Sequence, residues 1–320
     1  MVGRIIAIVV MIGSAGIAEF AQRPTPTPEP NRTGTPAAPM PQRDPERRVR
    51  ENNPDWDETQ TVDQLARLKE LTDVIYRKPT KQELAAVSVR PEFQKKYSQF
   101  LSRPDTGIFK LVNFECAKAA QVVSADERCL KLTMPGGAGS FSFRTKNYRI
   151  RHLADLTLTE GRLRTTGVLM NGLFAELGDV PIESVTLATP AAAALASVKA
   201  AVDASEVEAI AKRFETGDFQ GDVMLKVSAE PAVNTTYLMR AIGYRGKVKK
   251  ALGGVPYNEM DFDRRRDVIA AFRVVDIDTD GSVTIVWQRL SETESPKIDT
   301  EEKDEKKRSD GASSFVAGTR

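Results

Sequence analysis

The feature that most constrains the fold is an alternation of polar and apolar side chains from Tyr148 to Thr159. Apolar residues and His152 occupy every second position, and charged or hydroxyl-bearing residues occupy all the positions between them except position 153. This period of two is typical of a strand with one buried and one solvated face. The sequence therefore predicts an antiparallel sheet that is covered on one side.

A two-residue turn at 160–161 is predicted to join this strand to a second one. In the register that such a turn sets, Leu158 pairs with Leu163 on the apolar face and Thr157 pairs with Arg164 on the polar face. Both faces stay consistent across the hairpin. Shorter runs bounded by Gly, Pro and Asp predict further strands, at 108–112, 130–132, 141–143, 223–227, 272–277 and 283–290.

Helical patterns lie before and between these strands. Residues 56–104 predict a helical segment, with a periodic stretch from Val62 to Ile75 and a capping box at Thr80 and Glu83. A helical insertion is expected at about 190–216, with Thr189 as its N-cap. We predict an α+β fold in which N-terminal helices pack on a mainly antiparallel sheet. The β domain covers 105–291, with a possible division near 188.

The N-terminus is typical of a secretory signal. Arg4 is followed by an uninterrupted apolar stretch and then by small residues, so residues 1–21 are interpreted as a signal peptide. Cleavage is expected after Ala18, with Ala21 as the second choice. The alternative is a retained anchor, but 5–18 is shorter than the roughly 20 residues that span a bilayer. We expect export, to the periplasm, the envelope or the medium, with no transmembrane span after signal removal.

The segments next to both termini are predicted to be disordered. Residues 22–55 are rich in proline, which favours extended conformations and cannot build a core. Residues 292–320 form a charged tail with few apolar residues. Cys116 and Cys129 lie close together in a chain that is expected to leave the reducing cytosol, which predicts a disulfide between them.

The charge balance indicates no polyanionic partner, because 46 Lys and Arg residues face 44 Asp and Glu residues. No specific nucleic-acid binding is expected. One local cluster on the predicted polar face is a candidate anion-binding surface for an acidic envelope polymer, and it contains Arg144, Lys146, Arg149, Arg151, Arg162 and Arg164. The alternative is an ordinary salt-bridged surface, since Asp155 is predicted to lie diagonally opposite Arg164.

An acidic motif near the C-terminus resembles the start of a calcium loop. Asp276, Asp278 and Asp280 alternate before Gly281, as oxygen ligands do around Ca²⁺. The twelfth position is Trp287, where such a loop needs a bidentate Glu. A hairpin with the three-residue loop 279–281 explains the same residues. The plain hairpin is the favoured interpretation, and no other cofactor is expected.

The sequence identifies no catalytic residue. His152 is the only histidine, which excludes every mechanism that needs two, and its position predicts a packed core residue. The glycines of 135–140 are predicted to form a hairpin loop, because no phosphate-binding motif follows them. We therefore expect a non-catalytic binding or structural module of the envelope, with an acidic envelope polymer or another envelope protein as its partner. The alternative is an exported hydrolase that uses unidentified carboxylates, as glycosidases do.

Overall fold

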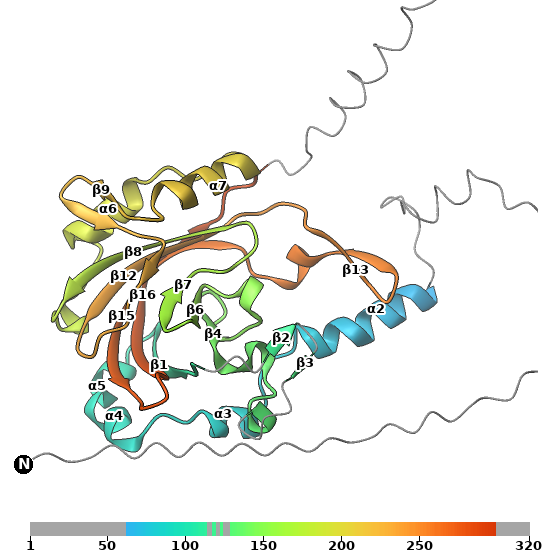
Figure 1. Ribbon diagram of the computed structural model, residues 1–320, viewed down its shortest axis with the longest axis horizontal. Helices are drawn as coiled ribbons and strands as arrows, with labels where there is room; N and C mark the ends of the chain where they lie inside the picture. Colours follow the sequence, from blue (N-terminus) through green and yellow to red (C-terminus); the bar gives the residue numbers. More distant parts are fainter. Residues whose placement is uncertain (1–61, 114–116, 120–121, 124–128, 299–320) are drawn as a thin grey trace, which may run out of the picture. The chain divides into compact units, whose positions relative to one another are not determined.

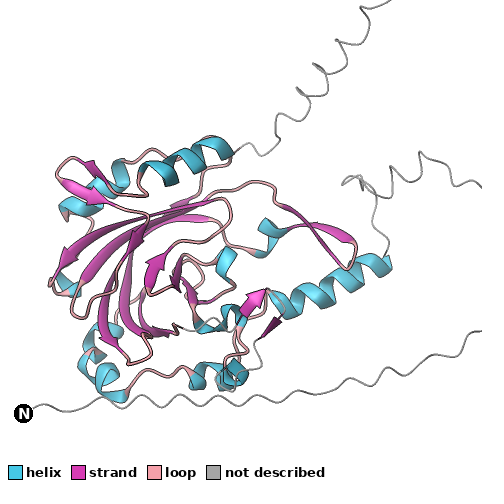
Figure 2. Cartoon of the chain, in the orientation of Figure 1, coloured by secondary structure: helices cyan, strands magenta, loops and turns pink. Residues whose placement is uncertain are grey.

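The computed structural model describes residues 62–113, 117–119, 122–123 and 129–298, which all belong to one compact unit, 55–320. Two antiparallel sheets lie in this unit, and helices pack against the larger one (Figure 1). Figure 2 shows the same view with the helices in cyan and the strands in magenta. The predicted α+β class, with mainly antiparallel strands, is confirmed.

The larger sheet has five strands, each antiparallel to its neighbours. Across the sheet they are β1 (Thr106–Leu111), β16 (Val283–Glu294), β15 (Arg266–Ile277), β12 (Thr236–Gly243) and β8 (Met170–Gly178). Strand β12 is buried along its whole length because both faces of the sheet are covered. β1 and β8 form the two edges.

The smaller sheet lies against one face of the larger one. Across it the strands are β11 (Ser228–Ala229), β7 (Arg162–Arg164), β6 (Leu156–Thr159), β4 (Ser140–Ser142) and β5 (Asn147–Tyr148). Aromatic rings fill the space between the sheets, and those of Phe109 and Phe141 stack with their centroids 3.9 Å apart. Trp287 packs beside them, with its ring centroid 5.8 Å from that of Phe141.

The predicted hairpin at 160–161 is confirmed. Leu158 pairs with Leu163 and Thr157 pairs with Arg164, as the polar and apolar faces require. The turn is of type I′, because Glu160 and Gly161 both have positive φ, at 53° and 70°.

Glu160 is therefore a site where stability can be gained. A side chain with a Cβ is strained at positive φ, and Asn tolerates this region better than Glu. We expect Glu160→Asn to raise the free energy of unfolding by about 0.5–1 kcal/mol. Urea unfolding measures the difference, and Glu208→Asn on the exposed face of a helix serves as the control. A loss of stability in Glu160→Asn would contradict this account of the turn.

The prediction of one continuous strand from Tyr148 to Thr159 was wrong. β5 ends at Tyr148, a 3₁₀ turn occupies Arg151–Leu153, and β6 begins at Leu156. The expected solvated face is also wrong, because Asp155 and Thr157 are fully buried. These polar side chains contact other polar groups inside the fold. The alternation shows that one face of the segment is polar, but it does not show whether that face contacts water or buried polar side chains.

Two further boundaries differ from the predictions. Residues 130–132 were expected to form a strand, but Cys129–Lys131 is a 3₁₀ turn. The tail was expected to start at 292, yet β16 continues to Glu294 and the side chain of Ile298 is buried. Pairing with the long strand β15 orders these residues, although their own composition is polar.

The helices that the structure describes lie within the predicted ranges 56–104 and 190–216, and two of them begin directly after Thr80 and Thr189. In chain order the helices are α2 (Val62–Ile75), α3 (Lys81–Ala86), α4 (Pro91–Lys96), α5 (Ser98–Leu101), α6 (Pro190–Ser197) and α7 (Ala204–Arg213). Tyr97 and Phe100 share a core with α6 and the larger sheet. α2 contributes Ile75 to a separate cluster with Met260. No helix within the described ranges is long and apolar enough to cross a membrane.

Short hairpins and connections complete the unit. β9 (Asp218–Gln220) pairs with β10 (Val223–Leu225), β13 (Lys249–Leu252) with β14 (Val255–Asn258), and β2 (Ala117–Ala119) with β3 (Val122–Val123). A 3₁₀ turn, η5 (Glu259–Phe262), follows β14 and leads into β15. This connection carries three of the buried charged side chains described below, namely Glu259, Asp263 and Arg265.

Candidate functional site

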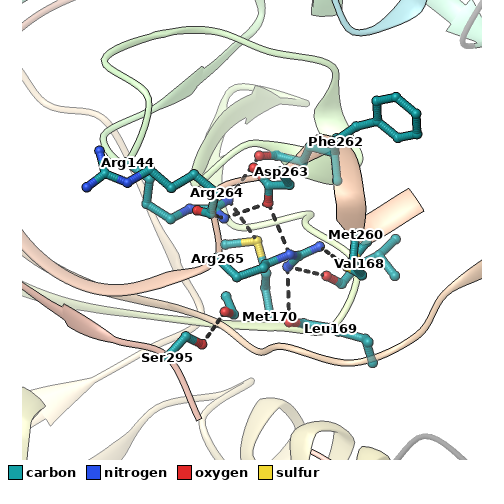
Figure 3. Close-up of polar contacts among 12 residues, drawn as sticks. Arg144, Val168, Leu169, Met170, Met260, Phe262, Asp263, Arg264, Arg265 and Ser295 are labelled. Atoms are coloured by element: carbon teal, nitrogen blue, oxygen red, sulfur yellow. Dashed lines mark hydrogen bonds and ion pairs between the residues drawn. The ribbon is translucent and has the colours of Figure 1, made fainter. Parts of the chain in front are cut away.

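A buried ion-pair network surrounds Arg144, which is the largest fully buried side chain of the described residues. Its Nε lies 2.6 Å from Oδ1 of Asp155. Its Nη1 lies 2.6 Å from Oδ2 of Asp263 (Figure 3). The same guanidinium donates to the backbone carbonyls of Leu153 and Arg264, both at 3.0 Å. Burial opposes the positive charge, but the two carboxylates outweigh it and raise the pKa of Arg144.

Two more arginines extend this network. Arg265 lies with its Nε 3.1 Å from Oδ2 of Asp263, and it donates to the carbonyl of Val168 at 2.8 Å. Burial lowers the pKa of Arg265 to about 10. Arg149 donates to the carbonyl of Phe262 at 2.5 Å, and burial lowers its pKa as well. The network thus ties the η5 connection to the smaller sheet, which is a structural role.

The candidate anion-binding surface is not a single exposed face. Arg144 and Arg149 are buried, so the prediction that they lie on a solvated face was wrong. Lys146 pairs with Asp105 at 2.6 Å, and Arg162 donates to the hydroxyl of Ser228 at 3.2 Å. The two remaining members, Arg151 and Arg164, are half-buried. Asp155 pairs with Arg144 instead of Arg164, because β4 and β6 are neighbours.

His152 belongs to a second polar cluster. Its Nε2 lies 2.5 Å from Oε1 of Glu259, and the hydroxyl of Tyr76 donates to the same oxygen at 2.9 Å. Burial alone would raise the pKa of Glu259, but the hydrogen bond from His152 and the neighbouring charges hold this pKa below its ordinary value. No hydroxyl or thiol in the described part of the chain bonds to the imidazole, so the nucleophile of a triad is missing there.

The three aspartates of the acidic motif have separate partners. Asp276 pairs with Arg90, Asp278 pairs with Lys110, and Oδ1 of Asp280 accepts from the backbone N–H of Ser282 at 2.8 Å. No group of three or more potential metal ligands occurs among the residues that the structure describes.

The hairpin interpretation of the acidic motif is confirmed in part. Ile277 pairs with Val283 and Asp276 with Thr284, and Gly281 has a φ of 79°. A bulge then makes Val274, instead of Val275, the partner of Ile285.

We expect Ca²⁺ titration to give no heat above dilution. Each aspartate is already paired or hydrogen-bonded, and the bidentate ligand that a calcium loop needs is absent from its twelfth position. Isothermal titration calorimetry of the purified chain measures this directly. Saturable heat that disappears in Asp278→Asn, but not in the control Asp261→Asn, would contradict the expectation.

The predicted disulfide stays a prediction, since Cys116 lies outside the described residues. Cys129 is fully buried in the core between the two sheets. The signal peptide at 1–21, the linker at 22–55 and the tail from 299 to 320 also lie outside the described ranges.

Within the described residues, cavities lie at both edges of the paired sheets, and the sequence indicated neither of the two. The β8-edge cavity, of about 540 Å³, is lined by Phe174, Glu176 and Leu177 of β8 and by parts of β10 and β11. The β1-edge cavity, of about 400 Å³, is lined by parts of β1 and β5 and by Trp287. Each cavity therefore lies where one edge of the larger sheet meets one edge of the smaller sheet.

The outer edge of β8 is paired only in part, and its unpaired part lies at the β8-edge cavity. The N–H and C=O of Phe174 both bond to Lys226, at 2.7 and 3.0 Å, so they point away from β12. The backbone groups of an antiparallel strand point in the same direction at every second residue, so those of Glu176 also point away from β12. The backbone groups of Glu176 have no partner among the described residues, and Glu176 lines the cavity. Such an edge is able to pair with an extended segment of another chain.

Acidic and apolar side chains around the β8-edge cavity are exposed and could contact a binding partner. Glu176, Asp222 and Glu230 form no ion pair with any described residue, and all three are exposed. Beside them, Phe219 and Met224 pair across the β9–β10 hairpin, with exposed fractions of 57% and 36%. Exposed apolar side chains beside an open strand edge are typical of an interaction surface.

Comparison of the chain with models of protein families, with curated proteins and with solved structures finds no match. The protein thus belongs to the α+β class. It has two packed antiparallel sheets, helices on the larger sheet, and a cavity at each edge strand of that sheet.

Proposed function

We propose that the protein is exported to the cell envelope and acts there as a non-catalytic binding module for another envelope protein. The partner contributes an extended segment, which pairs with the open edge of β8 in the β8-edge cavity. The observation that carries this proposal is the unpaired backbone of Glu176 inside that cavity. Export is supported by the signal-like residues 1–21 and by the proline-rich segment after them.

The charges around the cavity favour a segment with basic side chains. Three of the five charged lining side chains are acidic, namely Glu176, Asp222 and Glu230. Rim charges of this kind set specificity and association rate more than affinity. Hydrogen bonds from the strand edge and contacts with the exposed Phe219 and Met224 would supply the rest of the binding.

The test is isothermal titration of the mature chain with the peptide acetyl-Lys-Val-Lys-Val-Lys-amide. We expect saturable binding that becomes about threefold to tenfold weaker when Asp222→Asn is combined with Glu230→Gln. The matched control combines Glu208→Gln with Glu215→Gln, which are exposed and lie outside the cavity. Equal binding of the acidic peptide acetyl-Glu-Val-Glu-Val-Glu-amide, or no binding of either peptide, would refute this proposal.

The competing function is a carboxylate-dependent hydrolase, which would use a pair among Glu176, Asp222 and Glu230. All three are exposed, whereas a glycosidase holds its general acid protonated by burial or by a neighbouring charge. We therefore expect the chain to release no nitrophenol from p-nitrophenyl glycosides. Release that disappears in Glu176→Gln, and persists in the control Glu208→Gln, would favour the hydrolase.

A further inference from the structure

We propose that the β1-edge cavity is a second binding site, which takes an uncharged apolar ligand that carries a carbonyl-type hydrogen-bond acceptor. This site lies at the opposite edge of the larger sheet from the β8-edge cavity, and it is independent of the function proposed there. Three features of the cavity specify the ligand: its aromatic wall, its unpaired donors and its lack of free charge.

Aromatic side chains form part of the wall of the cavity. The side chains of Phe109, Phe141, Tyr148 and Trp287 line it, and each of them is buried. These rings form the edge of the aromatic core between the two sheets, where Phe109 and Tyr148 meet at a centroid distance of 6.4 Å. At about 400 Å³ the cavity has the size of small-ligand sites, which are typically apolar with a few polar groups.

The indole N–H of Trp287 is the first unpaired donor. It bonds to no acceptor among the described residues, although the side chain is only 3% exposed. Gly107 leaves the room for this ring, since a Cβ there would lie 2.6 Å from Nε1. An indole N–H only donates, so it can bond only to a group that accepts. A ligand with an acceptor at this point would satisfy it.

The edge of β1 supplies the second donor. The N–H of Lys110 donates to the hydroxyl of Tyr148 at 3.3 Å, and this hydroxyl donates to the carbonyl of Lys110 at 2.8 Å. The backbone groups of Lys110 thus point away from β16, and those of Ile108 point the same way. Ile108 lines the cavity, and its N–H has no partner among the described residues.

The cavity offers no free charge to a ligand. Lys146 is its only charged lining residue, and its Nζ lies 2.6 Å from Oδ1 of Asp105. Among the other polar lining residues, Gln94 already donates to the carbonyl of Val89 at 3.0 Å. An ionised ligand would lose its hydration without gaining a counter-ion, so an uncharged ligand is favoured.

The probe is Prodan, a neutral naphthalene that carries one ketone acceptor and no donor. Its emission shifts to the blue when it leaves water, so a titration of the mature chain measures its binding. We expect saturable binding that is lost in Ser88→Trp, because Ser88 is an exposed residue of the cavity wall and a larger ring there fills the space. Met224→Trp fills the β8-edge cavity instead and is expected to leave the Prodan affinity unchanged.

Trp287→Phe tests the indole donor separately from the space. We expect Prodan to bind about fivefold more weakly to this variant, and 2-(dimethylamino)naphthalene, which lacks the ketone, to bind equally to both chains. In NMR spectra of the wild type, Prodan is expected to move the indole N–H resonance of Trp287, which the same variant assigns. The proposal is overturned if Prodan does not bind saturably, or if Ser88→Trp leaves its binding unchanged. The role of the ketone is overturned if Trp287→Phe weakens the binding of both compounds equally.

Discussion

Replacement of Arg144 by Met is expected to lower the free energy of unfolding by about 3–5 kcal/mol, because it removes the cation between two buried carboxylates and leaves that of Asp155 without an ion-pair partner among the described residues. Arg144 connects Asp155 and Asp263, and all three side chains are fully buried. Arg265 still lies 3.1 Å from Asp263, but Asp155 keeps only hydrogen bonds from Ser142 and from the backbone of residue 144. Urea unfolding at neutral pH measures the loss.

Two further variants show whether the cost comes from the unpaired carboxylates. Addition of Asp155→Asn to Arg144→Met removes one of the stranded charges, so the double variant is expected to recover part of the lost stability. The control is Arg213→Met, which breaks a surface pair with Asp218 and is expected to cost less than about 1 kcal/mol. A cost of that size for Arg144→Met would contradict the structural role of the network.

Replacement of Glu83 by Gln is expected to lower the free energy of unfolding by about 1.5–3 kcal/mol at neutral pH, the range for hydrogen bonds to charged groups. Both oxygens of the carboxylate accept from Arg77, at 2.6 and 2.7 Å. The same group accepts from the hydroxyl of Thr133 at 2.7 Å and from the N–H of Thr80 at 2.8 Å. It therefore caps α3 and joins the helix to the segment before the smaller sheet.

The pH dependence of stability gives a second test of Glu83. Hydrogen bonds from Arg77 hold the pKa of this carboxyl well below its usual range. A lowered pKa means that Glu83 stabilises the fold above its unfolded pKa of about 4.3, and that this contribution is lost as the pH falls towards the folded pKa. Glu83→Gln is therefore expected to flatten the decline in stability below about pH 5.

The lowered pKa of Glu259 contributes to the same decline, but it is present in both chains and cancels in their difference. Glu92→Gln is the control, because its partner Arg90 lies 3.4 Å away and both side chains are exposed. We expect this variant to change stability by less than about 0.5 kcal/mol and to keep the pH dependence of the wild type. Equal pH profiles for Glu83→Gln and the wild type would show that the carboxylate is not selectively stabilised.

Local signals predicted the elements whose cause lies within a few residues of sequence. The capping box at Thr80 and the proline after Thr189 placed helix starts correctly, because both act on the first turn of the helix itself. The turn at 160–161 set the register of its hairpin, because polar and apolar faces would mix in any other register. These signals require no knowledge of the rest of the chain.

Strands β8 and β12 were not predicted, and their burial explains why. Every residue of β12 is buried, so the segment contains no polar face to alternate with the apolar one. In β8 the first six residues are buried as well. A strand covered on both sides cannot be told from other short apolar runs by its period. These two strands supply one edge of the larger sheet and the cavity beside it.

The sequence by itself determined the α+β class, the helix starts and the tightest hairpin, since each depends on neighbouring residues. Only the tertiary structure decided where the charges lie. Arg144, Asp155 and Asp263 are separated by up to 119 positions along the chain, and β4, β6 and the η5 connection bring them together away from water. The same packing leaves the edges of β1 and β8 unpaired beside cavities, which no local pattern of residues records.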